Sequence, residues 1–288
     1  MNPAIGNISA VSIDVRVDRD TVLPGRVWCA ARPRTMLAIV HGLGEHSGRY
    51  TALASDLARA RFTCVALDLP GHGEPPGPRG DIPSWTKLRD QIVPAMFTAS
   101  RGLPDQPPEL PCVLLGHSMG GVIALEYALA NPKALMALVL SAPALRTAVP
   151  PWWKLALANV ARAAAPASGF PNALDTDGLA RDPEVVRAYR TDPLVHDRIS
   201  PRTYFAFTEA AQRCRHDIGS LQVPTLMLQG MADRLVDPKG ALEAAATAPH
   251  GMLRFVTLRD AYHEVFNDTG REAVIRDLAA WLDVALVV

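Results

Sequence analysis

The 288-residue chain lacks an excess of one charge and lacks any long apolar run. Its 29 basic and 29 acidic residues cancel to a formal net charge of +0 and form no block of one sign, which argues against a nucleic-acid partner. No stretch approaches roughly 18 uninterrupted apolar residues, the length that indicates a membrane span. The N-terminus has no basic start followed by an apolar segment, so we expect no secretory signal.

Cysteine is also scarce. Cys29, Cys64, Cys112 and Cys214 lie far apart and form no CxxC pair. This spacing indicates free thiols in a reducing compartment rather than a disulfide framework or a metal site. We therefore expect a cytoplasmic protein and leave peripheral membrane association open.

Recognisable metal and nucleotide motifs are missing as well. His41, His46 and His72 lie in neighbouring segments, yet no set of His, Cys and carboxylate residues has the spacing of metal ligands. No G-x-G-x-x-G follows the first strand of a βαβ unit, and no P-loop occurs. We expect neither a metal nor another cofactor.

Apolar residues make up 49% of the chain, and many of them lie in short runs that end in Gly or Pro. These runs are too short for buried helices and do not alternate, which is typical of parallel strands covered on both faces. Residues 11–17 and 21–30 predict an antiparallel start to the sheet. Helix-like stretches separate the runs, and residues 270–286 predict a closing amphipathic helix. The pattern predicts an α/β fold with a mostly parallel sheet flanked by helices. The runs are "TMLAIVHG", "FTCVALDLPGHG", "CVLLGHSMGG", "ALVLSAP" and "TLMLQG".

One segment interrupts the alternation of strands and helices. Residues 146–219 contain no strand-like run, only helical stretches separated by prolines. We interpret them as a helical cap inserted over the carboxyl ends of the strands, where open α/β sheets bind ligands. The predicted division is a core of residues 1–145 and 220–288 with a cap of residues 146–219.

A candidate nucleophile lies in the G-x-S-x-G motif at residues 116–120, with Ser118 at its centre. A strand precedes the motif and a helix follows it, which is the context of a sharp turn that exposes a serine hydroxyl. The start of the helix also favours developing negative charge. A plain strand-to-helix turn with a capping serine is the alternative.

A serine nucleophile needs a base oriented by a carboxylate, and in this kind of fold the chain order is Ser, acid, His. Asp233 follows the strand-like run "TLMLQG", and His263 follows the last strand, so both occupy suitable positions. Asp237 in the same loop and Asp260 near the histidine are alternatives for the acid. Three further histidines follow no strand: His196, His216 and His250.

The loop after the strand that ends at Val40 begins with His-Gly-Leu-Gly. In this fold such a loop presents a backbone N–H to the substrate oxyanion, paired with the N–H of the residue after the nucleophile. These groups would belong to Leu43 and Met119. We expect His41 and His117 to organise the loops rather than to act as bases.

These motifs together resemble the monoacylglycerol lipase family of the α/β-hydrolase superfamily, close to its bacterial lipases and lysophospholipase-like esterases. The similarity extends over nearly the whole chain and is strongest in "HGLGEHSGRY", "LLGHSMGG", "LQGMADRLVD" and "AYHEVFND". It implies an eight-stranded, mostly parallel sheet with an inserted cap. It also implies hydrolysis of a monoacylglycerol to fatty acid and glycerol without a cofactor.

The resemblance assigns the nucleophile to Ser118, the acid to Asp233 and the base to His263, with Leu43 and Met119 forming the oxyanion hole. The sequence departs from the family in "GHGEPPG", where Pro75 takes the place of the usual serine. A lysophospholipase, a general carboxylesterase and a peptidase of the proline-iminopeptidase type are alternatives on the same scaffold. A non-catalytic ligand-binding homologue is a further alternative, against which the intact triad argues.

The cap stretch "PPWWKLALANVARAAAP" is apolar, with only Lys154 and Arg162 charged. Trp152 and Trp153 lie at its start and allow two interpretations. They belong to a substrate passage or a face that docks on a membrane or micelle, or they pack the cap onto the core.

Overall fold

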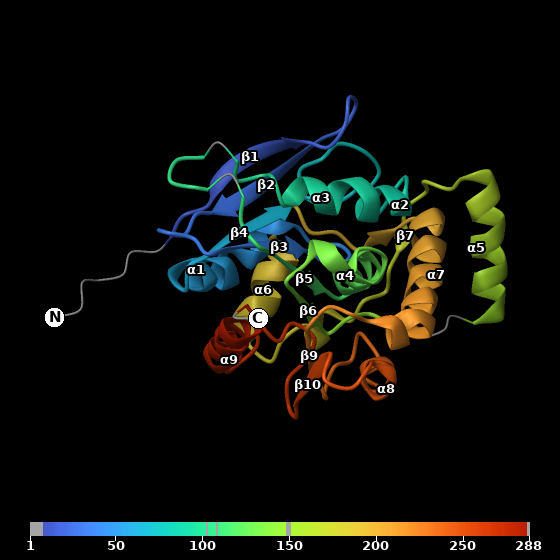
Figure 1. Ribbon diagram of the computed structural model, residues 1–288. Coiled ribbons are helices and arrows are strands. Elements are labelled where there is room, and N and C mark those ends of the chain that lie inside the picture. Colours follow the sequence, from blue (N-terminus) through green and yellow to red (C-terminus); the bar gives the residue numbers. More distant parts are fainter. Residues whose placement is uncertain (1–7, 102, 108, 148–150, 287–288) are drawn as a thin grey trace.

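The computed structural model describes residues 8–101, 103–107, 109–147 and 151–286. Its main sheet has eight strands in the order β1-β2-β4-β3-β5-β6-β9-β10, of which only the pairs β1–β2 and β2–β4 are antiparallel (Figure 1). This confirms the predicted α/β-hydrolase fold class. The strands are β1 (Val11–Arg16), β2 (Val22–Trp28), β3 (Thr35–Val40), β4 (Phe62–Leu67), β5 (Cys112–His117), β6 (Ala137–Ser141), β9 (Thr225–Gly230) and β10 (Leu253–Leu258).

The central strands are buried on both faces, which explains why their sequences are apolar without alternation. All six residues of β3, β4 and β9 are buried. Successive side chains of a strand point to opposite faces. In β3, Met36 and Ala38 therefore join one apolar cluster, and Leu37 and Ile39 join the other.

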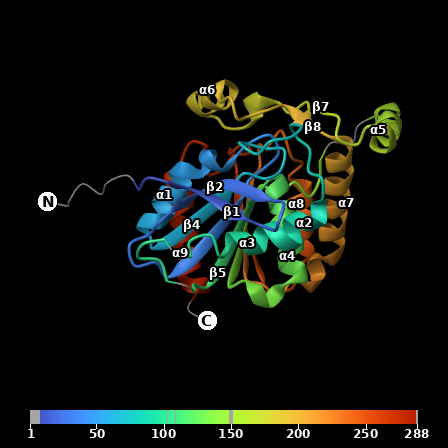
Figure 2. The ribbon, with the colours of Figure 1, turned by 90° about the horizontal axis from the view of Figure 1, so that it is seen from above.

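Helices cover both faces of the sheet (Figures 1 and 2). Residues of α3, α4, α7 and α8 belong to one apolar cluster, and those of α1 and α9 belong to the other. In α9, the predicted apolar face is confirmed, because Leu278 and Leu282 are buried and Val274 and Trp281 pack against them. The helices are α1 (Thr51–Arg59), α2 (Trp85–Lys87), α3 (Val93–Met96), α4 (Met119–Ala130), α5 (Trp152–Ala164), α6 (Pro183–Thr191), α7 (Pro201–Asp217), α8 (Lys239–Thr247) and α9 (Arg271–Ala285).

The segment between β6 and α7 stands over one end of the core and contains α5 and α6 (Figure 2). It also contains two short strands, β7 (Phe170–Pro171) and β8 (Arg198–Ile199), which pair antiparallel. The expectation that residues 146–219 hold helices alone was therefore wrong. Two residues per strand are too few to produce a recognisable sequence pattern.

Prolines begin two of the helices in this part of the chain, as the sequence indicates. Pro183 and Pro201 are the first residues of α6 and α7, where a missing N–H costs nothing. Asp182 caps α6 by accepting a hydrogen bond from the Glu184 amide, and Ser200 caps α7.

Helix α7 packs against α4 and contributes buried side chains to the apolar cluster of the core. These include Phe207, Ala210 and Cys214. Because α7 belongs to the layer that covers the sheet, we propose that the cap ends near Ser200 instead of at the predicted residue 219. The four cysteines are free, and Cys64 and Cys214 are buried.

Candidate active site

Ser118 occupies the single residue between β5 and α4, in a backbone conformation that side chains rarely adopt. Its φ is 52° and its ψ is −117°. Such a conformation costs about 1–3 kcal/mol and persists only where the surroundings enforce it. Two backbone hydrogen bonds do so, because the Ser118 amide donates to the Ser141 carbonyl and the Ala144 amide donates to the Ser118 carbonyl, each at 3.0 Å.

The glycines of the motif allow β5, α4 and β3 to approach each other at this turn. A Cβ atom on Gly116 would lie 2.3 Å from the Gly120 carbonyl oxygen. A Cβ atom on Gly120 would lie 2.1 Å from the carbonyl oxygen of Val40. Both distances are far below van der Waals contact, so this packing requires glycine at both positions.

Asp233 and His263 meet beyond the ends of β9 and β10. Nδ1 of His263 donates a hydrogen bond to Oδ2 of Asp233 at 2.8 Å, and both side chains are buried. Oδ1 of Asp233 accepts hydrogen bonds from the amides of Leu235 (2.8 Å) and Val236 (3.0 Å). The carboxylate is therefore held in place from its own loop while it orients the imidazole.

Electrostatics stabilise the charged form of this pair. Burial works to raise the pKa of Asp233, but His263 and the hydrogen bonds to the carboxylate outweigh burial and lower it. Burial works to lower the pKa of His263, but Asp233 outweighs it and raises that pKa above the ordinary value of about 6.5. An imidazole with these partners is suited to accept a proton.

The alternative candidates for the acid and the base do not contact the Asp233–His263 pair. Asp237 forms an ion pair with Arg146 at 3.3 Å, and Asp260 is exposed. Among the histidines, Nε2 of His196 contacts the Gly71 carbonyl. His216 and His250 are exposed.

Leu43 and Met119 line the same pocket as Ser118 and His263. Met119 is the first residue of α4, a position at which the amide has no partner within its helix. In the loop after β3, the Gly42 amide donates to Oε1 of Glu45 at 2.6 Å, which fixes the backbone just before Leu43.

His41 and His117 both contact backbone groups. His41 is buried, its Nε2 accepts a hydrogen bond from the Leu69 amide at 3.0 Å, and its Nδ1 lies 2.8 Å from the Gly42 carbonyl. Nδ1 of His117 lies 3.1 Å from the Ser141 carbonyl oxygen. Burial and the neighbouring His263 lower the pKa of His117 to about 4, so its ring is neutral near pH 7.

A buried polar cluster that no sequence motif indicated lies beside His263. Nη2 of Arg49 donates to both carboxylate oxygens of Glu264, at 2.7 and 2.6 Å, and its Nε donates to Glu45 at 3.2 Å. The hydroxyl of Tyr50 also donates to Glu45, at 2.7 Å. Burial works to raise the pKa of Glu45, but His117 and Arg49 outweigh it and lower the pKa to about 2.

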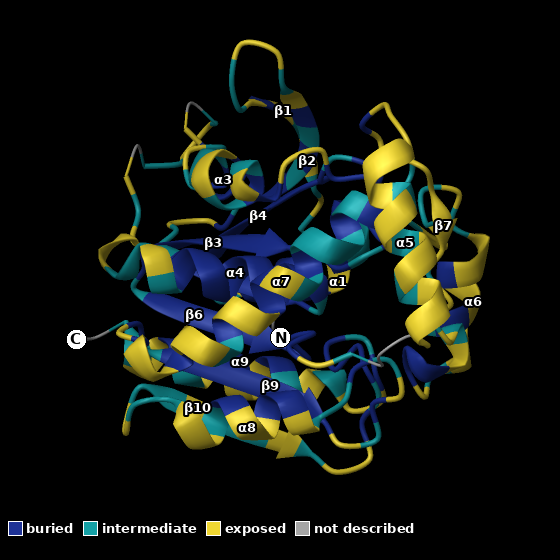
Figure 3. Ribbon diagram, turned by 90° about the vertical axis from the view of Figure 1, so that its right-hand side faces the viewer, coloured by how far each residue is buried: buried dark blue, intermediate teal, exposed yellow. Residues whose placement is uncertain are grey.

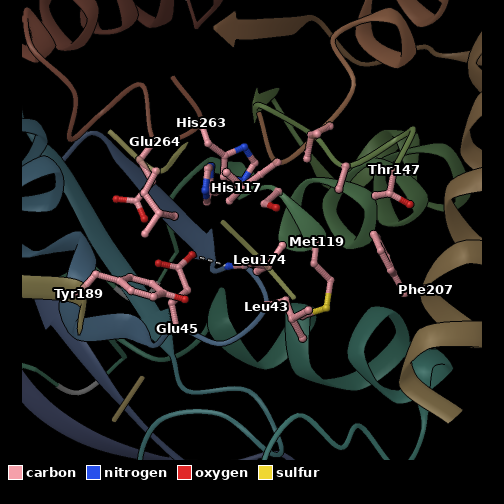
Figure 4. A pocket seen from close by; sticks show the side chains of 16 residues that line it. Leu43, Glu45, His117, Met119, Thr147, Leu174, Tyr189, Phe207, His263 and Glu264 are labelled. Carbon is pink, nitrogen blue, oxygen red and sulfur yellow. Dashed lines mark hydrogen bonds between the residues drawn. The ribbon is translucent and has the colours of Figure 1, made fainter. Parts of the chain in front are cut away.

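Figure 4 shows that the pocket has a polar side and an apolar side. Glu45, Tyr189 and Glu264 lie on one side, and Met119 and Phe207 lie on the other. The remaining lining residues are Gly42, Leu43, His117, Ser118, Ala144, Thr147, Leu174, Leu179, Leu235, Val236 and His263.

Three residues singled out from the sequence do not line this pocket. Trp152 and Trp153 lie on α5, with exposed fractions of 80% and 49%, and Pro75 is buried in the loop after β4. Within the described ranges, no group of three or more His, Cys, Asp or Glu side chains is placed to hold a metal ion.

The chain is similar to known proteins in sequence and in structure. A family model described as Serine aminopeptidase, S33 matches residues 31–270. The chain is 34% identical over 253 residues to a monoacylglycerol lipase of Mycolicibacterium smegmatis, covering 87% of this chain and 88% of that protein. It is 30% identical over 260 residues to the phospholipase YtpA of Bacillus subtilis, covering 89% and 98%.

Among solved structures, the crystal structure of Paleococcus ferrophilus monoacylglycerol lipase matches with a TM-score of 0.82 and 32% identity. The match covers 91% of this chain and 99% of that one. These similarities confirm the resemblance that the motifs indicated. The chain therefore belongs to the family described as Serine aminopeptidase, S33, within the α/β-hydrolase superfamily, and it is similar to monoacylglycerol lipases.

Proposed function

We propose that the protein is a carboxylic ester hydrolase that cleaves monoacylglycerols, with Ser118 as nucleophile, His263 as base and Asp233 as acid. One observation carries the proposal: the strained Ser118 lines the same pocket as His263, and His263 is hydrogen-bonded to the buried Asp233. The similarity to monoacylglycerol lipases supports the choice of substrate.

In the mechanism, Nε2 of His263 takes the hydroxyl proton of Ser118 while Oγ attacks the ester carbonyl. Asp233 keeps the proton of the imidazole on Nδ1 and stabilises the imidazolium that forms. His263 then gives the proton to the glycerol oxygen as the bond between this oxygen and the acyl carbon breaks. Glycerol departs, and the acyl group remains on Oγ of Ser118 as an acyl-enzyme. A water molecule then attacks the acyl carbonyl and gives a proton to His263. The bond between the acyl carbon and Oγ of Ser118 breaks, the fatty acid is released, and His263 returns the proton to Oγ.

The amides of Leu43 and Met119 stabilise the negative oxygen of the tetrahedral intermediate. Each such donor contributes roughly 3–4 kcal/mol at the transition state of an acyl transfer. Glu45 supports this arrangement because its carboxylate accepts a hydrogen bond from the Gly42 amide and so fixes the backbone just before Leu43. When ionised, this carboxylate has no proton to donate to the oxyanion, so the backbone amides are the donors.

The two sides of the pocket match the two ends of a monoacylglycerol. The apolar side suits an acyl chain, and the polar side suits hydroxyl groups that exchange hydrogen bonds with carboxylates and a phenol. A lysophospholipid is the second candidate, because a phospholipase is among the relatives. The polar side disfavours it, since the carboxylates of Glu45 and Glu264 share the guanidinium of Arg49 and would repel a phosphate.

The test is a substrate panel of monoacylglycerols, lysophospholipids, p-nitrophenyl esters and aminoacyl amides, run with Ser118→Ala as blank. We expect monoacylglycerol turnover that Ser118→Ala abolishes, and full activity in Ser220→Ala, which changes an exposed serine. Faster turnover of a lysophospholipid or an amide would replace the proposed substrate. Retained esterase activity in Ser118→Ala would overturn the assignment of the nucleophile.

We further propose that α5 docks peripherally on a lipid surface. None of its residues is buried, and its large apolar side chains Trp152, Leu157 and Val160 are 80%, 63% and 67% exposed (Figure 3). Lys154 adds a positive charge that favours an anionic surface, whereas Arg162, the other charged residue of the helix, pairs with Glu209 at 3.1 Å. No helix of the described segments is long and apolar enough to cross a bilayer.

A further inference from the structure

We propose that Gln229 is a positioning residue of the triad, whose side-chain amide fixes the Asp233 carboxylate from within the sheet. The proposal rests on the catalytic role of Asp233 proposed above. Gln229 lies on β9, one residue before its end, and its side chain is completely buried. It directly precedes the glycine of "LQGMADRLVD" in the sequence.

The hydrogen bonds define the orientation of the Gln229 amide. Nε2 donates to Oδ2 of Asp233 at 3.1 Å and to the Gly230 carbonyl at 3.0 Å. Both partners are acceptors, so the reversed amide would place an oxygen against two oxygens. The nitrogen therefore faces the carboxylate.

The other end of the same amide is unpaired. Oε1 of Gln229 is buried and has no hydrogen-bond partner among the residues that the structure describes. An unpaired buried carbonyl opposes folding, and an apolar side chain of similar size on this strand would avoid it. The unpaired Oε1 atom of Gln229 therefore destabilises the folded state. At the other end of the amide, Nε2 forms a hydrogen bond with Asp233 that offsets this cost.

The four donors around Asp233 divide evenly between its two oxygens. Oδ1 is held by the amides of Leu235 and Val236, and Oδ2 by His263 and Gln229. His263 is the group to be oriented, so its own bond from Nδ1 cannot fix the carboxylate on which that orientation depends. Gln229 supplies the donor to Oδ2 that comes from outside the catalytic pair, and it opposes rotation of Oδ2 away from His263.

The same contact affects the basicity of His263. A donor on Oδ2 withdraws negative charge from the oxygen that faces the imidazole, so its removal strengthens the attraction between Asp233 and the imidazolium. The other groups that face His263 are His117, whose ring centroid lies 4.7 Å away, and the carboxylates of Glu45 and Glu264, which Arg49 partly neutralises. These groups stay unchanged when Gln229 is replaced.

Two substitutions separate positioning from packing. Gln229→Met keeps about the same volume and removes both the Nε2 donor and the unpaired Oε1 atom. We expect kcat to fall roughly 10- to 100-fold, in line with the effect of removing the hydrogen-bond partner of a metal-ligating side chain. KM for a soluble ester should stay within about twofold, because Gln229 does not contact the pocket, and only removal of transition-state interactions lowers kcat alone. The acid limb of the kcat/KM profile should move to higher pH.

Gln229→Glu supplies the signature that a packing role would not give. At high pH the introduced carboxylate faces Oδ2 of Asp233 and repels it, so activity should fall further than in Gln229→Met. As the pH falls, the two carboxylates share a proton, and the introduced carboxyl group, once protonated, again donates a hydrogen bond to Asp233. The activity relative to the unaltered protein should therefore rise toward lower pH.

Met227→Leu is the matched control, since Met227 is also buried on β9 and shares the face of the strand with Gln229. Unaltered kinetics and pH profiles in both Gln229 variants would overturn the proposal, as would an equal, pH-independent loss in Met227→Leu. If Gln229→Glu does not fold, the pH profile of Gln229→Met decides. Failure of the proposed function is distinguishable, because it would appear as activity in Ser118→Ala whatever the Gln229 variants do.

Discussion

The edge of the sheet and helix α5 differ in how tightly the surrounding structure holds them. At the sheet edge, backbone hydrogen bonds and close glycine packing enforce the strained conformation of Ser118. In α5 no residue is buried, and Trp152 is 80% exposed. Catalytic side chains must be held in a fixed geometry, because small displacements reduce the reaction rate. A docking surface has to remain accessible to its partner instead. We therefore propose that the reaction takes place at the sheet edge and that the cap contacts lipid.

The largest expected effect is that of Asp233→Asn. The amides of Leu235 and Val236 would keep the asparagine oxygen at the Oδ1 position, so the NH₂ group would face Nδ1 of His263. The imidazole would then carry its proton on Nε2 and could not accept one from Ser118. We expect kcat to fall about 10⁴-fold.

Asp237→Asn is its control, since Asp237 lies in the same loop but pairs with Arg146. Hydrolysis of a soluble ester is the measurement for both variants. Full activity in Asp233→Asn together with a loss of activity in Asp237→Asn would show that Asp237, and not Asp233, is the acid.

The next largest effect is on stability. Gly120→Ala would place a Cβ atom 2.1 Å from the Val40 carbonyl oxygen, in backbone that cannot yield easily. We expect the free energy of unfolding to fall by about 1–3 kcal/mol or more, with a loss of esterase activity. Gly219→Ala, whose nearest neighbour would lie 3.8 Å away, should leave the denaturant midpoint unchanged or slightly higher. Equal midpoints in the two variants would show that the turn is not held as described.

The cap prediction concerns Trp152→Ser combined with Trp153→Ser. Burial of a large apolar side chain contributes about 1.5–3 kcal/mol, so binding to anionic liposomes should weaken at least roughly tenfold. Turnover of a short soluble ester should not change, because neither side chain lines the pocket. The melting temperature should not change either, because neither side chain is buried. Val284→Ser on α9, which removes another exposed apolar side chain, should not alter liposome binding. Equal loss of binding and soluble-ester turnover would instead assign the tryptophans a packing role.

The smallest effect is the pH dependence of kcat/KM. Asp233 outweighs burial and raises the pKa of His263, and only the neutral imidazole accepts the proton of Ser118. Activity is therefore full above this pKa and is lost as the pH falls through it, so the acid inflection should lie above the ordinary value of about 6.5. An inflection below that value would show that burial dominates over Asp233.

The sequence predicted those parts of the site that follow from strand order. Ser118, Asp233 and His263 each follow a strand, and parallel strands end at one edge of a sheet, so proximity followed from topology. Contacts between distant segments left no local pattern. Arg49 and Glu264 lie 215 positions apart and meet only through the fold. The strands β7 and β8 are too short to show periodicity, and the packing of α7 on α4 depends on tertiary contact.

The central claim is that Ser118 is the nucleophile that cleaves the monoacylglycerol ester. Its most direct test is to treat the protein with a fluorophosphonate, locate the adduct by peptide mass spectrometry, and measure monoacylglycerol hydrolysis at each extent of labelling. We expect a single adduct on Ser118, with hydrolysis falling in proportion to labelling. An adduct on another residue, or hydrolysis that continues when Ser118 is fully labelled, would contradict it.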